Sequence, residues 1–165
     1  MLRKTSILAV ATMMSIGAIA TPALADDHKK LVILQDAPVL ADHHDPDFKP
    51  NETGAVLFFG ADLRSTKGKK VGELIGQITT FDVRLDGVDE EDRFRELVFN
   101  MKGGQIVALG ASQYARTEVP NFADNNAPVT IAIVGGTGDY AGARGTVTTK
   151  KRANGTYKHT FRFIE

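Results

Sequence analysis

The chain of 165 residues has no Cys, no Trp and no net charge. The absence of Cys excludes thiol nucleophiles, Cys-ligated zinc, iron–sulfur clusters and disulfide frameworks. Its 20 Lys and Arg are balanced by 20 Asp and Glu, whereas a general nucleic-acid binder needs a surplus of basic residues on one face. We therefore expect no nucleic-acid partner and a single domain held together without metal or disulfide cross-links.

The first 25 residues have the pattern of a secretory signal peptide. Arg3 and Lys4 form a positive end, residues 6–20 are largely apolar, and Ala23-Leu24-Ala25 is a small-x-small cleavage site. A permanent anchor would need about 20 uninterrupted apolar residues, and Gly17 is one of several interruptions in this stretch. No later run approaches that length, so we expect no membrane span.

Cleavage near Ala25 predicts a secreted or periplasmic location and a mature domain that comprises residues 26–165. Removing Arg3 and Lys4 leaves 18 basic and 20 acidic residues, so the formal net charge of the mature domain is −2.

The mature chain reads as all-β. No window of a dozen residues repeats its apolar positions at helical spacing, while short runs rich in Val, Ile, Thr and Phe recur between Gly, Asn, Asp and Pro. The eight expected strands are Lys30–Gln35, Ala55–Leu63, Lys70–Val83, Asp92–Met101, Gln105–Gln113, Val129–Val134, Gly145–Lys151 and Thr156–Ile164.

The connections favour an antiparallel up-and-down barrel. Lys102-Gly103-Gly104 and Ala153-Asn154-Gly155 are short enough for hairpins. Two connections are long, Ala37–Gly54 and Ala115–Pro128, and such loops are usually either functional lids or simply mobile. Because no helix covers the sheet, closure of eight strands into a barrel best removes the exposed edges, and a barrel of this size holds side chains or one small ligand.

Alternation along two runs assigns side chains to the two faces of the sheet. In the third run Gly72, Leu74, Gly76, Ile78 and Thr80 share one face, and Ile75 and Phe81 lie on the other. In the last run His159 shares a face with Tyr157, Phe161 and Phe163. His159 is either a general acid or base or, more commonly for such a position, a histidine satisfied by packing on an aromatic face.

The most distinctive motif is the glycine-rich stretch from Gly135 to Gly142. Gly136-x-Gly138-x-x-Ala141 follows an apolar run and formally matches a dinucleotide-binding fingerprint. The β-branched run after Arg144 lacks the apolar stripe of a helix. The stretch therefore predicts a tight corner between strands, with glycines at positive φ.

This stretch makes the chain resemble a known superfamily. Ile133–Val147 is similar to the Gly-Gly-Thr-Gly corner and Ala-Arg-Gly strand start of the dirigent protein and allene oxide cyclase superfamily. Gly54–Phe59, Val71–Gly76 and Gly104–Gly110 look like further strands of that family, in the same order, so the resemblance covers about residues 30–165. It implies an eight-stranded barrel, often trimeric, whose pocket shapes a reactive intermediate during cyclisation or radical coupling.

The resemblance does not imply the activity of the plant allene oxide cyclases. Where they carry a Cys in the third strand this chain has Ile78, and where they carry an Asn in the second strand it has Ala61. Their acidic residue in the first strand aligns near Gln35 or Asp36. These replacements leave few polar groups to hold an epoxide oxygen and water.

The dirigent resemblance implies roles for Asp139 and Arg144, which match acidic and basic pocket positions of dirigent proteins. Arg144 could equally hold the corner through hydrogen bonds to carbonyl groups. Ser112 and Tyr114 are polar candidates at a barrel mouth, and Ser112 aligns with an aromatic hydroxyl of the cyclases. The candidate ligand-binding residues are Gln35, Asp36, Ile78, Ser112, Asp139 and Arg144; no catalytic residue is assigned.

A metal site is a weaker hypothesis. Asp42-His43-His44-Asp45-Pro46-Asp47 holds imidazole and carboxylate groups, which are common ligands of zinc and nickel. Adjacent loop residues rarely converge on one ion, so a solvated loop is the simpler interpretation. We expect no metal and no cofactor.

Two functions stay open. The first is an exported barrel that binds a small hydrophobic or phenolic ligand and steers its cyclisation or coupling in the lumen, as an isomerase-like or dirigent-type protein. The second is a noncatalytic structural or interaction barrel whose lumen is filled by apolar side chains. In either case Ile75 and Phe81 offer outer apolar surface that a homotrimer or dimer would bury.

Overall fold

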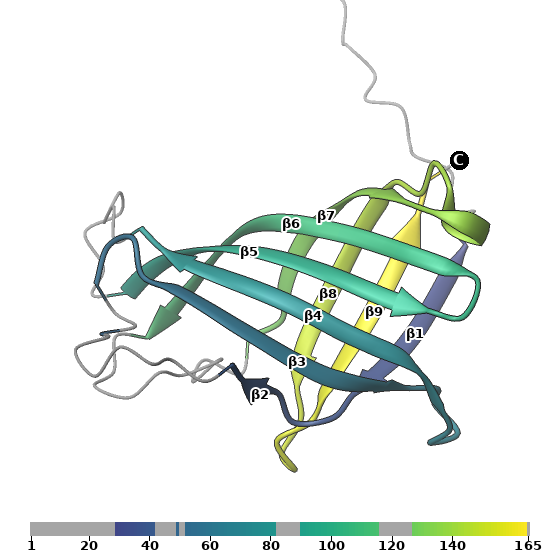
Figure 1. Ribbon diagram of the computed structural model, residues 1–165, viewed down its shortest axis with the longest axis horizontal. Coiled ribbons are helices and arrows are strands. Elements are labelled where there is room, and N and C mark those ends of the chain that lie inside the picture. Colours follow the sequence, from purple (N-terminus) through teal and green to yellow (C-terminus); the bar gives the residue numbers. More distant parts are fainter. Residues whose placement is uncertain (1–28, 42–48, 50–51, 82–89, 116–126, 165) are drawn as a thin grey trace, which may run out of the picture.

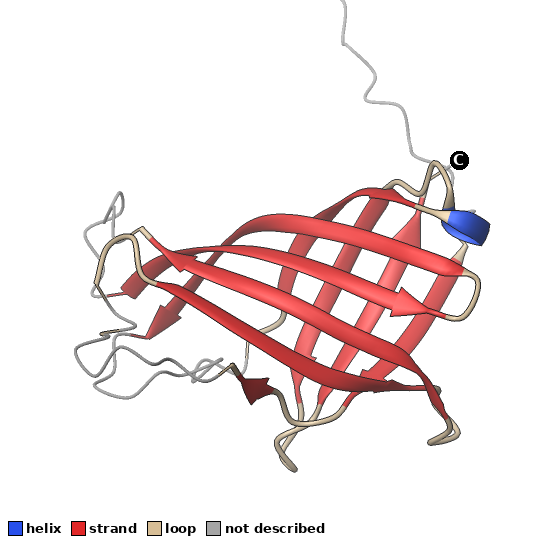
Figure 2. Ribbon diagram, viewed as in Figure 1, coloured by secondary structure: helices blue, strands red, loops and turns tan. Residues whose placement is uncertain are grey.

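The structure, a computed structural model, describes residues 29–41, 49, 52–81, 90–115 and 127–164. Within these residues the elements are strands and one short helical turn (Figure 2), as the sequence predicts for an all-β chain. None of the described segments forms a helix that could cross a membrane. The elements are β1 (Lys30–Gln35), β2 (Val39–Leu40), β3 (Val56–Arg64), β4 (Lys70–Thr80), β5 (Glu90–Met101), β6 (Gly104–Ala115), β7 (Val129–Gly136), η1 (Gly138–Tyr140), β8 (Gly145–Lys151) and β9 (Tyr157–Phe163).

The strands form a closed antiparallel barrel. The sheet order is β1-β9-β8-β7-β6-β5-β4-β3-β2, and a second pairing of β1 with β3 closes it into eight strands plus the short β2. At this seam Leu34 pairs with Arg64 and Gln35 with Leu63. Strands β3 to β6 lie in front of β7, β8, β9 and β1, so that the two groups form opposite walls (Figure 1). The predicted barrel is confirmed.

Strand β2 lies in a segment that the sequence assigns to a loop. Val39 and Leu40 pair with Gly60 and Phe59, so the chain follows β3 on both sides of Pro38. Proline has no N–H group to donate to a ladder, which explains why β1 and β2 are separate strands. The β1–β9 ladder ends where Gln35 pairs with Tyr157, and β2 continues along β3 without β9.

The predicted turns are confirmed. Gly103, between β5 and β6, has φ 99°, and Gly155, between β8 and β9, has φ 78°. In the glycine-rich corner Gly138 has φ 57° and the helical turn η1 spans three residues. Because strand β8 follows instead of a helix, the corner has no architecture for a dinucleotide, as the sequence indicates.

The faces of β4 also follow the predicted alternation. Leu74, Gly76, Ile78 and Thr80 are buried, whereas Ile75 is exposed. A side chain at Gly76 would overlap the ring of Phe59 on the neighbouring strand, so glycine is needed here for a close approach. The lumen core is apolar and tightly filled; its fully buried members are Leu63, Ile78, Leu97, Phe99, Ile106, Ala108, Val147 and Phe161.

Candidate functional site

Buried polar side chains gather at one end of the lumen. This is the end where β4, β6 and β8 finish and where β5 and β9 begin. Away from it the lumen is lined by Leu, Ile, Val and Phe. The buried polar residues, which we call the polar end, are Gln35, Thr80, Arg93, Arg95, Ser112, Thr149 and His159.

One side of the polar end is built by three neighbouring strands. Arg93 on β5 pairs with Thr80 on β4 and with Ser112 on β6, so the three side chains lie in one row across the sheet. The hydroxyl of Ser112 donates a hydrogen bond of 3.4 Å to the backbone carbonyl of Arg93. Arg95 lies one row deeper, between Ile78 and Gly110.

The opposite side centres on His159. Its Nε2 lies 2.7 Å from Oε1 of Gln35 and its Nδ1 lies 2.9 Å from Oγ1 of Thr149. Because an amide oxygen only accepts, Nε2 carries the proton, and Nδ1 accepts from the Thr149 hydroxyl. The ring also packs edge-on against Phe99, with centroids 4.9 Å apart.

Burial controls the charge of this imidazole. Desolvation, followed by the positive charge of Arg95, lowers the pKa of His159 from 6.5 to about 3. The ring is therefore neutral at physiological pH, with both nitrogens hydrogen-bonded to protein groups. This favours the interpretation of His159 as a satisfied, packed histidine over a general acid or base.

A small cavity lies between the two sides. It has a volume of about 10 Å³, and it is lined by Gln35, Pro38, Phe59, Leu74, Arg95, Leu97 and Tyr157. That volume holds about one water molecule. Three of its walls, Gln35, Arg95 and Tyr157, are polar and come from three different strands.

Three of the six candidate ligand-binding residues lie in the lumen. Gln35 and Ser112 belong to the polar end, and Ile78 is fully buried beside Arg95. The structure thus brings Gln35, Ile78 and Ser112 to one part of the barrel. The side chain of Tyr114 lies outside what the structure describes.

Asp36 lies instead at the outside of the seam. Arg64 donates from Nε to both of its carboxylate oxygens, at 3.0 and 2.8 Å, and its Nη2 lies 2.7 Å from Oδ2. The Arg64 hydrogen bonds hold the pKa of the Asp36 carboxyl below its ordinary value. The pair fastens the linker between β1 and β2 to the end of β3.

Asp139 and Arg144 lie at the opposite end of the barrel, around the glycine-rich corner, and both are exposed. Asp139 lines a surface depression of about 480 Å³ together with Leu31, Tyr140 and Phe163. The backbone carbonyl of Arg144 accepts a hydrogen bond from Ile164 at 3.0 Å. Ligand contact by either side chain stays a prediction, and neither reaches the polar end.

Arg93 and Arg95 are site residues that the sequence reading missed. The signal was present, because alternation along β5 places both on the face of Leu97, Phe99 and Met101. Basic residues are almost never fully buried without a structural or functional reason. Two of them on an otherwise apolar face mark the polar end.

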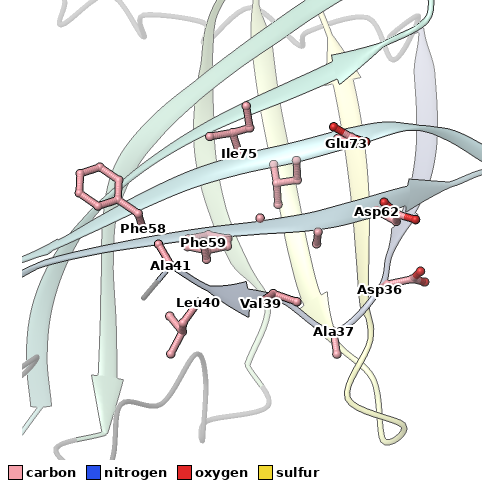
Figure 3. Close-up of a pocket in the computed structure, with 13 residues that line it drawn as sticks. Asp36, Ala37, Val39, Leu40, Ala41, Phe58, Phe59, Asp62, Glu73 and Ile75 are labelled. Atoms are coloured by element: carbon pink, nitrogen blue, oxygen red, sulfur yellow. The ribbon is translucent and has the colours of Figure 1, made fainter. Parts of the chain in front are cut away.

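A second hollow lies on the outer surface of the barrel (Figure 3). This outer groove has a volume of about 690 Å³ and follows β2, β3 and β4. Val39, Phe58 and Ile75 supply exposed apolar walls, being 72%, 48% and 59% exposed. Asp36, Asp62 and Glu73 line one end of it, where Arg64 pairs with Asp36 and Lys70 pairs with Asp62 and Glu73.

No cluster of three or more potential metal ligands occurs in the parts of the chain that the structure describes. The Asp42–Asp47 segment lies outside those parts. A metal site at His43 and His44 therefore stays an untested hypothesis from the sequence.

Comparison with known proteins identifies the fold. No protein-family model matches the sequence. No curated protein matches it either. The barrel is similar to the solved structure of a pyocyanin demethylase, with a TM-score of 0.58 and 25% identity over 82% of this chain and 100% of that one.

Two further similar structures are a Diels–Alderase and a dirigent protein. AbnU, an exo-specific intermolecular Diels–Alderase, has a TM-score of 0.59 and 17% identity over 82% of this chain and 97% of its own. The pterocarpan synthase dirigent protein GePTS1 has a TM-score of 0.53 and 18% identity over 82% of both chains. The chain has the fold of the dirigent and cyclase-like barrels.

Proposed function

We propose that this protein is an exported barrel that binds a small hydrophobic or phenolic compound at the polar end of its lumen. There it steers a cyclisation or a stereoselective coupling by positioning the reacting groups and excluding water. A Diels–Alderase and a dirigent protein among the structures with this fold support the proposal at the level of architecture. The residues of the polar end support it at the level of the site.

The observation that carries the proposal is the burial of polar side chains in a barrel whose remaining lumen is apolar. Arg93 and His159 are 1% exposed. Burying a charged group such as the Arg93 guanidinium is costly even when it is paired, and apolar residues would close a barrel equally well. Polar groups placed inside an apolar pocket are the usual way in which a binding site fixes the orientation of a ligand.

Ligand entry requires side chains to move, since the cavity at the polar end holds about one water molecule. Arg93 has a long, rotatable side chain that does not line this cavity, so its displacement would open space beside the cavity while Arg95 stays in the wall. The remaining walls, such as Phe59 and Leu97, supply apolar surface for a ring.

The proposal includes export and self-association. Signal cleavage near Ala25 would place the mature domain in the periplasm or outside the cell, and mass spectrometry of the purified protein would locate the new N-terminus. The exposed apolar side chains of the outer groove lie next to one another rather than singly, and such patches commonly mark interaction sites. We propose that a homotrimer or dimer covers it.

Thermal unfolding with a panel of phenols and apolar compounds tests the function, combined with the product stereochemistry of a phenol oxidised in the protein's presence. We expect ligand-induced stabilisation in the wild type and its loss in Ser112→Leu, which adds bulk to the polar end. Ala111→Leu is the matched control, because Ala111 faces outward on the same strand. If the wild type shows no ligand-induced stabilisation and no altered product stereochemistry, the proposal is refuted.

A noncatalytic interaction barrel is the second candidate. It is favoured by the tight packing of the lumen, in which Leu63, Leu97 and Phe161 are fully buried. In that case the outer groove would be the functional surface. Wild-type protein that binds no compound in the panel but associates through Ile75 would support this alternative.

A further inference from the structure

The cavity at the polar end is large enough for a single oxygen atom of a ligand. Its volume is about 10 Å³, close to the space that one water molecule occupies. It lies beneath Pro38, where the β1–β9 ladder ends at the Gln35–Tyr157 pair and β2 continues only along β3. The cavity therefore adjoins a place in the wall where no ladder joins β2 to β9.

The first polar wall is the side chain of Gln35, whose orientation is fixed by a hydrogen bond from His159. Its Oε1 accepts the Nε2–H of His159, and His159 in turn accepts the hydroxyl of Thr149. With the oxygen of the amide turned to His159, its NH₂ group is turned away from the ring. The NH₂ group of Gln35 is therefore the part of its amide that can donate to an oxygen in the cavity that Gln35 lines.

The second polar wall is Arg95, a permanent cation. Its charge reaches across the lumen, because it contributes to the lowered pKa of His159. Tyr157 supplies the third polar wall, and its hydroxyl can donate.

The remaining walls are apolar. Phe59, Leu74 and Leu97 are 5%, 1% and 0% exposed and keep bulk water away from the cavity. In such surroundings the interaction between a donor and a negative oxygen is much stronger than in water. The Gln35 amide, which His159 holds in place, also needs little reorganisation when charge develops on the oxygen.

We propose that this cavity is an oxyanion-binding subsite, in which Gln35, Arg95 and Tyr157 receive one negatively charged oxygen of the ligand. The ligand class is then an organic molecule with a phenolate, enolate or carboxylate oxygen attached to an apolar body. This inference rests on the proposed small-molecule function and specifies the chemistry that it accepts. His159 is a positioning residue, since it acts by holding the amide of Gln35.

Two nitrophenyl probes that differ by one methyl group on the oxygen test the subsite. 4-Nitrophenol can ionise and 4-nitroanisole cannot, and the phenolate absorbs at a longer wavelength than the phenol. We expect bound 4-nitrophenol to have a pKa at least about one unit below that of the free probe, which corresponds to roughly tenfold tighter binding of the phenolate. 4-Nitroanisole should bind more weakly than the phenolate.

Three variants assign the effect to the cavity. Gln35→Glu keeps an acceptor for His159 but replaces the donor by a carboxylate, and Arg95→Met removes the charge while keeping length; both should abolish the pKa shift of the probe. Tyr157→Phe, which removes one hydroxyl only, should reduce the shift. Arg162→Met is the control, because Arg162 is exposed on β9, and its shift should equal that of the wild type.

The outcomes separate the two levels of the proposal. Equal binding of both probes, with no pKa shift, overturns the oxyanion subsite but leaves a small-molecule barrel. A shift that persists in Arg95→Met, Gln35→Glu and Tyr157→Phe overturns the assignment to this cavity. Binding of neither probe to folded wild type overturns the subsite, and failure of the whole compound panel then overturns the function as well.

Discussion

His159 on β9 and Gln35 on β1 are 124 positions apart in the sequence and are joined by a hydrogen bond of 2.7 Å from Nε2 to Oε1. The bond lies inside the barrel, on the strand pair next to the seam. It sets the tautomer of the imidazole and the direction of the amide together. One buried pair therefore fixes which groups face the neighbouring cavity.

The first prediction concerns stability against pH. Because folding lowers the pKa of His159 from 6.5 to about 3, the unfolded chain binds a proton that the native chain does not between these values. The free energy of unfolding should fall on acidification through this window, by up to about 1.4 kcal/mol per pH unit from this residue. Above the window the contribution is constant.

Urea unfolding of wild type and His159→Gln at several pH values measures this contribution. The stability difference between them should shrink as the pH decreases, since the variant lacks the buried imidazole. Thr160→Ser, next to it on the same strand, should leave the pH dependence of the wild type. A difference independent of pH would show that His159 does not change its proton affinity on folding.

The second prediction concerns Asp36 and Arg64 at the seam. Both side chains are more than a third exposed, at 39% and 38%, so solvent screens their interaction. Arg64→Met should lower the free energy of unfolding only slightly, and high salt should reduce the loss. Urea titrations at low and high salt measure this loss of stability, and Arg162→Met is the control. A salt-independent loss of several kcal/mol would contradict the screened pair.

The sequence was sufficient for the barrel because alternation is local. The pattern of β4, in which Leu74 and Ile78 are buried and Ile75 is exposed, can be read without any partner strand. Turn glycines such as Gly103 fixed the hairpins in the same way. The pairing of Val39 and Leu40 could not be read, because two residues after Pro38 carry no periodicity and depend on the edge that β3 offers.

The site was less predictable because its contacts are long-range. Gln35 and Ser112 were identified through the family resemblance, but nothing local indicates that Gln35 meets His159. Arg93 and Arg95 could have been identified from alternation, since they share the face of Leu97. Which of several inward polar residues surround a cavity depends on how the strands are staggered around the barrel.

The third prediction concerns self-association through the outer groove. Ile75 is 59% exposed and is flanked in the sheet by Gly60 and Val98, so a charge there would face any partner copy. Ile75→Glu should convert the oligomer to a monomer in sedimentation experiments at micromolar concentration. Thr146→Glu adds the same charge on the outer face of β8 and should leave the assembly intact. A monomeric wild type would refute the proposal.

The fourth prediction tests whether close packing keeps the cavity wall rigid. A side chain at Gly76 would overlap the ring of Phe59, and Phe59 also lines the cavity. Gly76→Ala should therefore destabilise the barrel by about 1–3 kcal/mol, measured by urea unfolding. Gly135→Ala, where a new Cβ would meet nothing within 4 Å, should change the stability by less than about 1 kcal/mol.

A double-mutant cycle distinguishes this overlap from a backbone effect. If the ring causes the loss, Gly76→Ala should be much less damaging in a Phe59→Leu background, with a coupling energy of about 1 kcal/mol or more. Additive effects would mean that Phe59 moves aside easily when Gly76 is enlarged. The cavity would then be deformable on this side, and its donors would not be held in place for an oxygen. The rigidity of the oxyanion subsite therefore depends on a glycine two strands away from Gln35.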